Sequence, residues 1–419
     1  MIKKRLFGGF LMLLTMSSVF LVGEAKAQSA IEVKNDLDTY KDDVNQGMGV
    51  LSSRIAALEG KGKLNIKGDV RYRHEIQNQK ADKAPALKRQ DNRGRDRVRV
   101  RLGLDKTVNK EVYAALGLAT GGTEPTSTNQ TFEKFFIGKT LALDYGYLQW
   151  TPSLLKGRLA LTGGKMKNPL LTSATLWDSD TNPEGMFGEL KLPKMTFVRG
   201  GWWDLQENSG ASPLNKEYGM AVYQFEHDVR LAGWDTQWAM GYTQVLFANK
   251  LAGNATWDPI AKGGNVKNLK GVLLDFKVLD GFLQLKRKVG KMDLAILFQT
   301  THNMTSFDIR TADKTAKNNN ENAYITEVNL GKIALKNDYA FGLRWGYLQP
   351  NAVYGGFTDS DSGFCNRKFL RAFVGYGLAE GLELDIAGFG LRRVNYDVLS
   401  TKESRKTAYT TLIDLVVKI

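Results

Sequence analysis

Apolar and polar residues alternate along most of the chain from residue 63 onward. Residues 63–76 show this first, because apolar side chains occupy one parity and charged or polar side chains occupy the other. The first face carries Leu64, Ile66, Val70, Tyr72 and Ile76, and the second carries Asn65, Lys67, Asp69, Arg71, Arg73 and Glu75. A period of two predicts a β-strand that is apolar on one side and charged on the other.

The following strand is the most polarised of the chain. Its charged face carries Arg95, Arg97, Arg99 and Arg101, and its apolar face carries Val98, Val100, Leu102 and Leu104. The same alternation continues to the last residue, where Tyr409, Ile413, Leu415, Val417 and Ile419 share one face. We therefore expect β-structure throughout residues 63–419, with apolar residues outward in the final strand.

Long and short connections alternate between these strands. The short connections include Val108–Lys110, Leu192–Lys194, His227–Ala232 and Ala379–Gly381. The connections that alternate with them are longer and more polar. Counting gives about 16 strands joined by eight long and seven short connections, the pattern of an up-and-down membrane barrel. A possible bend at Leu279–Gly281 leaves the register of residues 267–299 open.

A soluble β-sandwich would also bury one face of each strand, so alternation alone does not identify the architecture. Apolar faces recur on every strand, however, which leaves too much apolar surface for a sandwich core. Charged rows on the opposite faces suit a wetted interior, and aromatic residues such as Trp150 and Trp345 fall near strand ends, as interface girdles require. These features favour an all-β, membrane-spanning, up-and-down antiparallel β-barrel.

The first 62 residues have a different pattern. Residues 1–27 resemble a signal peptide, with a basic start, an apolar run from Leu6 to Val22 and an Ala25-Lys26-Ala27 cleavage site. Residues 28–62 show helical spacing in two short heptad blocks, which predicts a periplasmic helix on the barrel rim or a short coiled coil. We therefore divide the chain into a signal peptide (1–27), a helical segment (28–62) and an outer-membrane barrel (63–419).

The net charge is +14, and removing the signal peptide, which contributes +4 − 1 = +3, leaves +11. A basic excess is compatible with nucleic acid, an acidic surface or an anion path, and export argues against nucleic acid. Cys365 is the only cysteine, so no intrachain disulfide stabilises the fold.

One long irregular stretch interrupts the alternation. It contains Gly163-Gly164-Lys165-Met166, Asn168-Pro169, Trp177-Asp178, Asp180 and Asn182-Pro183-Glu184-Gly185. Together with Ser127–Phe132 and Tyr147–Pro152, this stretch resembles the signature of the bacterial "putative porin" family of outer-membrane channels, over about residues 63–205. The resemblance implies a barrel channel and no particular solute.

The irregular stretch is the third long loop when strands are counted from Leu64. The arrangement is similar to that of trimeric general porins, in which this loop folds inward and narrows the pore. We hypothesise a constriction with a basic wall of Arg71, Arg73, Arg95, Arg97, Arg99 and Arg101 opposite an acidic loop of Asp178, Asp180 and Glu184. Opposed charges at a narrowing set ion preference, and the basic excess predicts a mild preference for anions. Alternatively, the arginines are paired with neighbouring acids such as Asp69 and Glu75, and the loop acids only cap turns.

Other chemistry has little support. The three histidines, His74, His227 and His302, lie in different environments, and no nucleophile elbow or metal-ligand cluster is present. Asp359–Gly363 hints at a calcium loop but lacks its distal acidic residue, which favours a polar loop tip. We predict no enzymatic activity, catalytic residue, cofactor or metal.

The function that these observations favour is passive diffusion of ions and small hydrophilic solutes across a Gram-negative type outer membrane. Expected partners are outer-membrane lipid, the barrel assembly machinery and two further copies of the chain in a homotrimer. The alternative is a structural barrel that tethers the membrane to the cell wall through its N-terminal helix. The final Ile419 departs from the aromatic residue that usually ends such barrels.

Overall fold

The computed structural model describes residues 64–78, 92–122, 124–133, 135–206, 218–246, 263–265, 275–305, 309–310, 316–317, 321–394 and 407–419. The chain divides into two units, residues 1–63 and Leu64–Ile419, and only the second contains described residues. The predicted signal peptide and the helical segment 28–62 lie outside the described residues.

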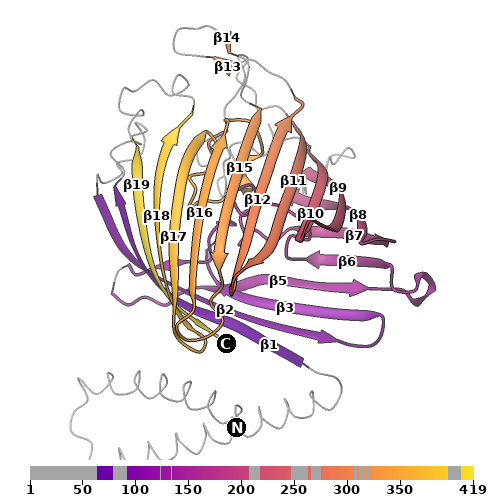
Figure 1. Ribbon diagram of the computed structural model, residues 1–419, viewed down its shortest axis with the longest axis horizontal. Helices are drawn as coiled ribbons and strands as arrows, with labels where there is room; N and C mark the ends of the chain where they lie inside the picture. The colour runs from indigo at the N-terminus through magenta and orange to yellow at the C-terminus, as the bar shows by residue number, and fades with distance from the viewer. Residues whose placement is uncertain are drawn as a thin grey trace, which may run out of the picture. The chain divides into compact units, whose positions relative to one another are not determined.

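The described residues of the second unit form sixteen long strands, and Figure 1 shows them in chain order. They are β1 (Leu64–Asn78), β2 (Asn92–Thr107), β3 (Val112–Thr120), β5 (Leu141–Trp150), β6 (Leu159–Lys165), β7 (Glu184–Leu192), β8 (Thr196–Gln206), β9 (Tyr218–Leu231), β10 (Trp234–Val245), β11 (Phe276–Val289), β12 (Met292–Asn303), β15 (Asn322–Gly331), β16 (Tyr339–Leu348), β17 (Arg367–Ala379), β18 (Leu382–Arg393) and β19 (Ala408–Lys418). Three two-residue pieces, β4 (Gln130–Thr131), β13 (Ile309–Arg310) and β14 (Ala316–Lys317), lie in long connections.

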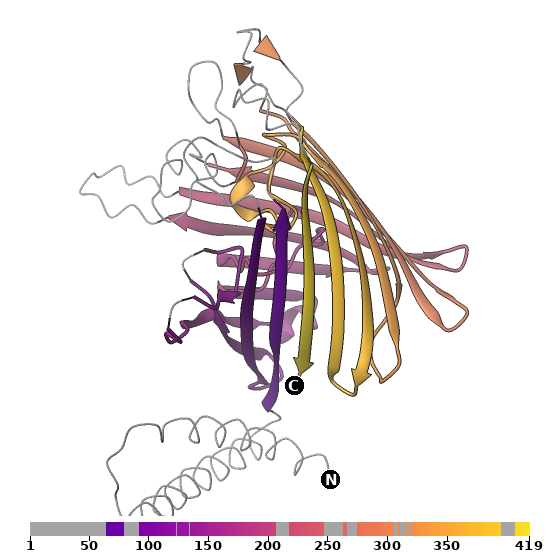
Figure 2. The same ribbon diagram turned by 90° about the vertical axis from the view of Figure 1, so that its left-hand side faces the viewer.

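The sheet closes on itself. Each long strand pairs antiparallel with its neighbours in the chain, and β1 pairs with β2 on one side and with β19 on the other. Figure 2 shows the first strands, in indigo, beside the last strand, in yellow. The predicted antiparallel barrel of about 16 strands is therefore confirmed. Closure matters because it pairs the polar backbone of every long strand, as any strand that crosses a bilayer would require.

The connections alternate as the sequence predicts, and two details needed correction. Strand β9 continues to Leu231 and turns over Ala232 and Gly233, so the predicted turn at residues 227–232 began too early. The Leu279–Gly281 segment is no bend, because β11 runs through it with continuous pairing to β10 and β12.

The two faces of the barrel wall differ as the alternation predicts. Outward side chains such as Met186, Met240 and Phe298 are apolar and exposed. Inward positions hold the charged residues of β1 and β2 and a set of buried apolar residues on β7–β12. Among the described residues, no helix is long and apolar enough to span a membrane.

Candidate pore constriction

Loop 3, residues 166–183, connects β6 to β7, and a glycine lies near its end in each of the two strands. Gly164 and Gly185 pair with each other at its base, with φ values of 121° and 147°. A Cβ on Gly164 would lie 2.4 Å from the Gly146 carbonyl oxygen, and one on Gly185 would lie 2.2 Å from that of Trp202. Both the backbone conformation and the lack of space therefore require glycine where the loop leaves the wall.

Loop 3 lies against inward side chains of the wall. The Trp177 ring centroid is 5.3 Å from that of Trp203 on β8, and Leu176 packs in a buried cluster with Phe282 and Leu297 of β11 and β12. Trp177 also donates its indole N–H to the Thr181 carbonyl oxygen at 2.8 Å. The sequence alone suggested an inward loop, and these contacts place its middle inside the barrel.

A second connection also folds inward. Loop 7, residues 349–366, joins β16 to β17, and its Phe357 ring stacks on Trp177 with centroids 4.8 Å apart. The Asp178 N–H donates to the Phe357 carbonyl oxygen at 2.7 Å, and the Asp359 N–H donates to the Thr175 carbonyl oxygen at 3.1 Å. Backbone hydrogen bonds thus join loops 3 and 7 into one structure within the lumen.

Six arginines form a ladder on the wall across from the aromatic contacts: Arg71, Arg73, Arg95, Arg97, Arg99 and Arg101. They come from inward positions of β1 and β2, where Arg71 pairs with Arg99 and Arg73 with Arg97 across the strands. Like charges directly opposite each other are destabilising, so such an arrangement requires nearby carboxylates.

Carboxylates of the wall contact every arginine of the ladder. Arg99 and Arg101 both donate to Asp69, with shortest distances of 2.7 Å, and Arg95 makes a two-point contact with Glu75 at 2.7 and 2.9 Å. Arg97 lies 3.4 Å from the same Glu75 carboxylate. The pairing of the ladder with Asp69 and Glu75, the alternative interpretation of the sequence, is thus present in the structure.

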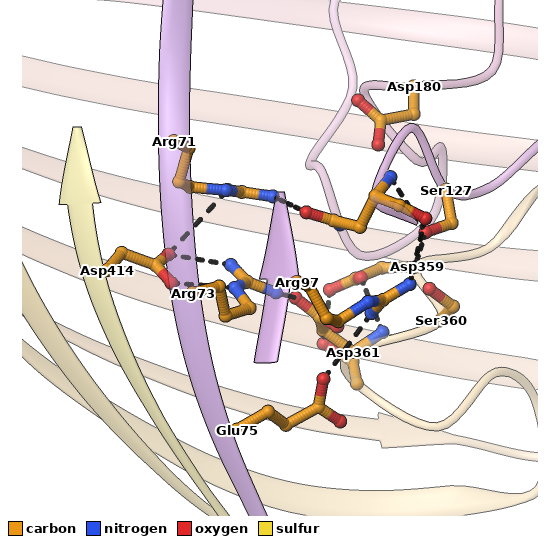
Figure 3. Close-up of polar contacts among 12 residues, drawn as sticks. Arg71, Arg73, Glu75, Arg97, Ser127, Asp180, Asp359, Ser360, Asp361 and Asp414 are labelled. Atoms are coloured by element: carbon orange, nitrogen blue, oxygen red, sulfur yellow. Dashed lines mark hydrogen bonds and ion pairs between the residues drawn. The ribbon is translucent and has the colours of Figure 1, made fainter. Parts of the chain in front are cut away.

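The ladder also binds the inward loops (Figure 3). Arg73 donates to both Asp414 oxygens of β19, at 2.7 and 2.8 Å, and to Asp361 of loop 7 at 3.0 Å. Arg71 donates to the Asn129 side-chain oxygen at 2.6 Å, and Arg97 donates to the Ser127 hydroxyl at 3.1 Å. Residues 124–129 and loop 7 therefore meet at the arginine side of the lumen.

The three predicted loop acids occupy different surroundings. Asp180 faces the ladder: its carboxylate lies 3.6 Å from the Arg101 guanidinium and accepts from the Thr128 N–H and hydroxyl, both at 3.0 Å. Glu184 does not join it, because it begins β7 on the face of the exposed Met186 and pairs with Lys165 at 2.6 Å.

Asp178 is buried between loops 3 and 7. Its carboxylate accepts the Asp180 N–H at 2.9 Å and the Ser360 N–H at 3.3 Å. Burial, and then the neighbouring Asp359 carboxylate, raise the pKa of Asp178 to about 9. Of the three predicted acids, the structure therefore brings only Asp180 close to the ladder. Asp178 lies instead where loop 3 contacts loop 7.

Sequence reasoning missed the acids of loop 7. Asp361, which binds Arg73, and Asp359, whose carboxylate lies 3.7 Å from Arg344, come from the segment interpreted as a polar loop tip. That interpretation was wrong, because Ser362 of the same segment and the preceding Thr358 are buried. Asp359-Ser360-Asp361 is acidic like the loop 3 motif, which is the one signal that could have linked it to the arginines.

Within the described part of the chain, no three His, Cys, Asp or Glu side chains are grouped so that they could hold a metal ion. Cys365 is buried, and its thiol lies 3.5 Å from the Val353 carbonyl oxygen. Burial raises the pKa of the Cys365 thiol to about 12, so the sulfur stays protonated and unreactive.

Residues 41–232 match the family model described as "putative porin". The family resemblance seen in the sequence is confirmed. The match contains β1, β2, loop 3 and thus the whole arginine ladder with its facing loop. No curated protein sequence matches the chain.

The fold is similar to the high-pH structure of OprB from Pseudomonas putida, with a TM-score of 0.56, 11% identity, and coverage of 88% of this chain and 97% of that chain. Salmonella typhi OmpF in complex with daunomycin matches with a TM-score of 0.49, 11% identity, and coverage of 86% and 98%. At such identities only the fold is shared, and the likeness to OprB supports it.

Proposed function

We propose that the protein is an outer-membrane porin through which ions and small hydrophilic solutes diffuse passively. The family match supports a porin, and a barrel of 16 strands is wide enough to hold an aqueous channel. The observation that carries the proposal is the packing of Trp177 on the inward Trp203, because it holds loop 3 inside the barrel. A loop in this position narrows the pore without closing it.

The constriction in this proposal lies between the arginine ladder and the joined loops 3 and 7. Its loop side contributes Asp180 and Asp361, and its wall side contributes the six guanidinium groups. Arg101 is the most exposed of the ladder side chains in ion pairs, at 31%, against 5% for Arg73. Solutes would therefore meet Arg101 and Asp180, whereas Arg73 fastens the loop to the wall.

The proposed ion preference is for anions and is small. Six arginines of the ladder contact five carboxylates, those of Asp69, Glu75, Asp180, Asp361 and Asp414, which leaves 6 − 5 = +1. A constriction whose fixed charges nearly cancel discriminates weakly between ions of opposite sign.

Reversal potentials in planar bilayers under a salt gradient test this proposal. We expect discrete channels with a mild anion preference in the wild type, and a shift toward cations in the single variants Arg97→Ala and Arg99→Ala, each of which turns the +1 balance into 0. Arg230→Ala is the matched control, because that side chain lies at a turn and is 77% exposed. Absence of conductance contradicts the channel, and a cation-selective wild type or unchanged potentials in both ladder variants contradict the role of the ladder.

The remaining assignments complete the proposal. Residues 1–27 would direct export and be removed, residues 28–62 would form a periplasmic helix, and the barrel assembly machinery would insert residues 63–419 into the outer membrane. Three copies would associate through lipid-facing walls. Cross-linking of purified protein followed by sizing tests the trimer, and N-terminal sequencing of the mature chain tests cleavage before Gln28.

A further inference from the structure

A cavity of about 80 Å³ lies on the side of the lumen away from the ladder. Loop 3, loop 7 and inward residues of β8–β12 enclose it. Aromatic rings supply much of its surface, namely Trp177, Trp203, Tyr354 and Phe357, and the polar lining includes Asp280 and Thr301. Neither lysine nor arginine contributes to the lining.

Asp280 supplies the one carboxylate of this cavity. It sits at an inward position of β11, opposite Gly241 of β10. A Cβ on Gly241 would lie 2.0 Å from the Asp280 Oδ1 atom, so the glycine leaves the carboxylate room. Its one side-chain contact in the described structure is with the Gln299 amide at 3.5 Å, which is too long for a strong hydrogen bond, and no described Lys or Arg pairs with it.

The ladder acids provide a direct contrast. Asp69 and Asp414 each bind guanidinium groups at 2.7 Å, whereas no cation among the described residues pairs with Asp280. Burying a carboxylate without a counter-charge is expensive, so the site gains free energy when a cation enters.

Unpartnered donors line the same cavity, and Thr301 of β12 lies directly opposite Asp280 across the two strands. The Trp203 indole N–H, the Thr301 hydroxyl and the Asn168 amide are buried lining groups without a hydrogen-bond partner in the described structure. Gln299 is already engaged, because its side-chain oxygen accepts the Ser173 N–H at 2.6 Å and its amide donates to Thr172 at 3.2 Å. A ligand bound at Asp280 therefore needs a positive group for the carboxylate and an uncharged acceptor for the Thr301 hydroxyl.

We propose that this cavity binds a small organic cation that carries an ammonium group and a hydroxyl group. The ammonium binds the Asp280 carboxylate. The hydroxyl oxygen accepts from the Thr301 hydroxyl on the neighbouring strand. A cavity that binds benzene has a volume of about 150 Å³, so this smaller cavity admits only a ligand smaller than benzene. An anion is excluded because no lining group is cationic.

Binding to the full chain in detergent tests the site directly, by calorimetric titration with 2-aminoethanol. Ethylene glycol and glycolate serve as a neutral and an anionic analogue of similar size. We expect saturable binding of 2-aminoethanol, at least tenfold weaker binding of ethylene glycol, and none of glycolate. Asp280→Asn should weaken 2-aminoethanol binding at least tenfold, because it removes the charge and keeps the shape.

Asp293→Asn is the matched control, since Asp293 lies on the neighbouring β12 but at its exposed turn end, paired with Lys288 at 2.7 Å. Thr301→Val gives a second test should Asp280→Asn fail to fold. It removes the hydroxyl and keeps the shape, so affinity for 2-aminoethanol should fall several-fold while affinity for ethylammonium, which has no hydroxyl, stays the same.

Three outcomes overturn the proposal: equal binding of 2-aminoethanol and ethylene glycol, unchanged affinity in both site variants, or displacement of 2-aminoethanol by equimolar sodium or potassium, which would show a site for a bare ion. The titration does not require conduction. A barrel that conducts without binding 2-aminoethanol contradicts only this inference, and one that binds without conducting contradicts only the proposed channel.

Discussion

The two sides of the lumen hold the same inward loops by different means. On the side of β1, β2 and β19, Arg73 binds Asp361 of loop 7, and Arg101 lies near Asp180 of loop 3. On the side of β8–β12, aromatic and aliphatic side chains of the loops pack against the wall, as Trp177 does on Trp203. One attachment is charged and directional, and the other is apolar.

This difference assigns separate tasks to the two sides. Apolar burial stabilises the loops in proportion to the area removed from water and tolerates small shifts. Ion pairs add little net stability once desolvation is counted, but they fix position, and breaking one partner leaves an uncompensated charge. We infer that the aromatic side supplies most of the binding free energy of the loops and that the arginine side sets their register.

The largest expected effect is on the charged side. Arg73→Met keeps most of the length of the side chain but leaves Asp414 and Asp361 without their closest cation, and its side chain is only 5% exposed. Loss of one partner of a buried ion pair typically destabilises a protein by about 3–5 kcal/mol.

Urea titration of the refolded barrel, followed by its change in gel mobility, measures this loss. Arg230→Met is the control, because Arg230 is 77% exposed and 3.6 Å from an exposed Asp235. Equal stability of the two variants would show that the Arg73 pairs contribute nothing that a surface pair does not.

A smaller effect is expected on the aromatic side. Trp177→Ala removes the ring that lies between Trp203 and Phe357. Because Trp177 is only partly buried, we expect about 3 kcal/mol, the low end for a large aromatic residue. Freed from the wall, loop 3 should also narrow the path less, so single-channel conductance should rise.

Trp345→Ala is the control for Trp177, because Trp345 points outward from β16 and is 44% exposed. If Trp177→Ala leaves conductance at the wild-type value while Trp345→Ala changes it, loop 3 does not limit the current. The two variants therefore separate an effect on the constriction from a general effect on the barrel.

The sequence predicted the wall better than the lumen. Parity alone placed Arg95–Arg101 inward and Val70 and Leu415 outward, because a strand in a barrel has only two faces and the bilayer accepts only one kind of side chain. Alternating connection lengths then gave the strand count. Both features are local, so they can be read from neighbouring residues.

The partners of the ladder could not be predicted in the same way. Arg73 binds Asp361 and Asp414, which lie 288 and 341 positions further along the chain. Such pairing depends on closure of the barrel and on the path of loop 7, and neither leaves a periodic trace. Spacing in the sequence likewise grouped Glu184 with Asp180, whereas the start of β7 turns Glu184 to the outer face.

The smallest expected effect concerns Asp178, which lies where the two kinds of attachment meet. Its pKa is raised to about 9 by burial and by Asp359. Between its usual pKa and about 9 the folded protein therefore holds a proton that the unfolded chain has released, so stability falls as pH rises through this range.

Asp178→Asn removes the charge and keeps an oxygen for the Asp180 and Ser360 N–H groups. We expect it to match the wild type near pH 4 and to exceed it by on the order of 1 kcal/mol at pH 9, since the two carboxylates can share one proton.

Thermal unfolding at pH 4, 7 and 9 measures this difference, and Asp338→Asn supplies a control of opposite sign. The backbone N–H groups of Ala334 and Leu335 hold the pKa of Asp338 below its usual value, so its contribution is present at neutral pH and is lost as pH falls. Asp338→Asn should therefore lower stability at pH 7. Parallel pH profiles for the wild type and Asp178→Asn would show that Asp178 stays ionised in the fold, and that loops 3 and 7 are joined by their backbone hydrogen bonds and aromatic contacts alone.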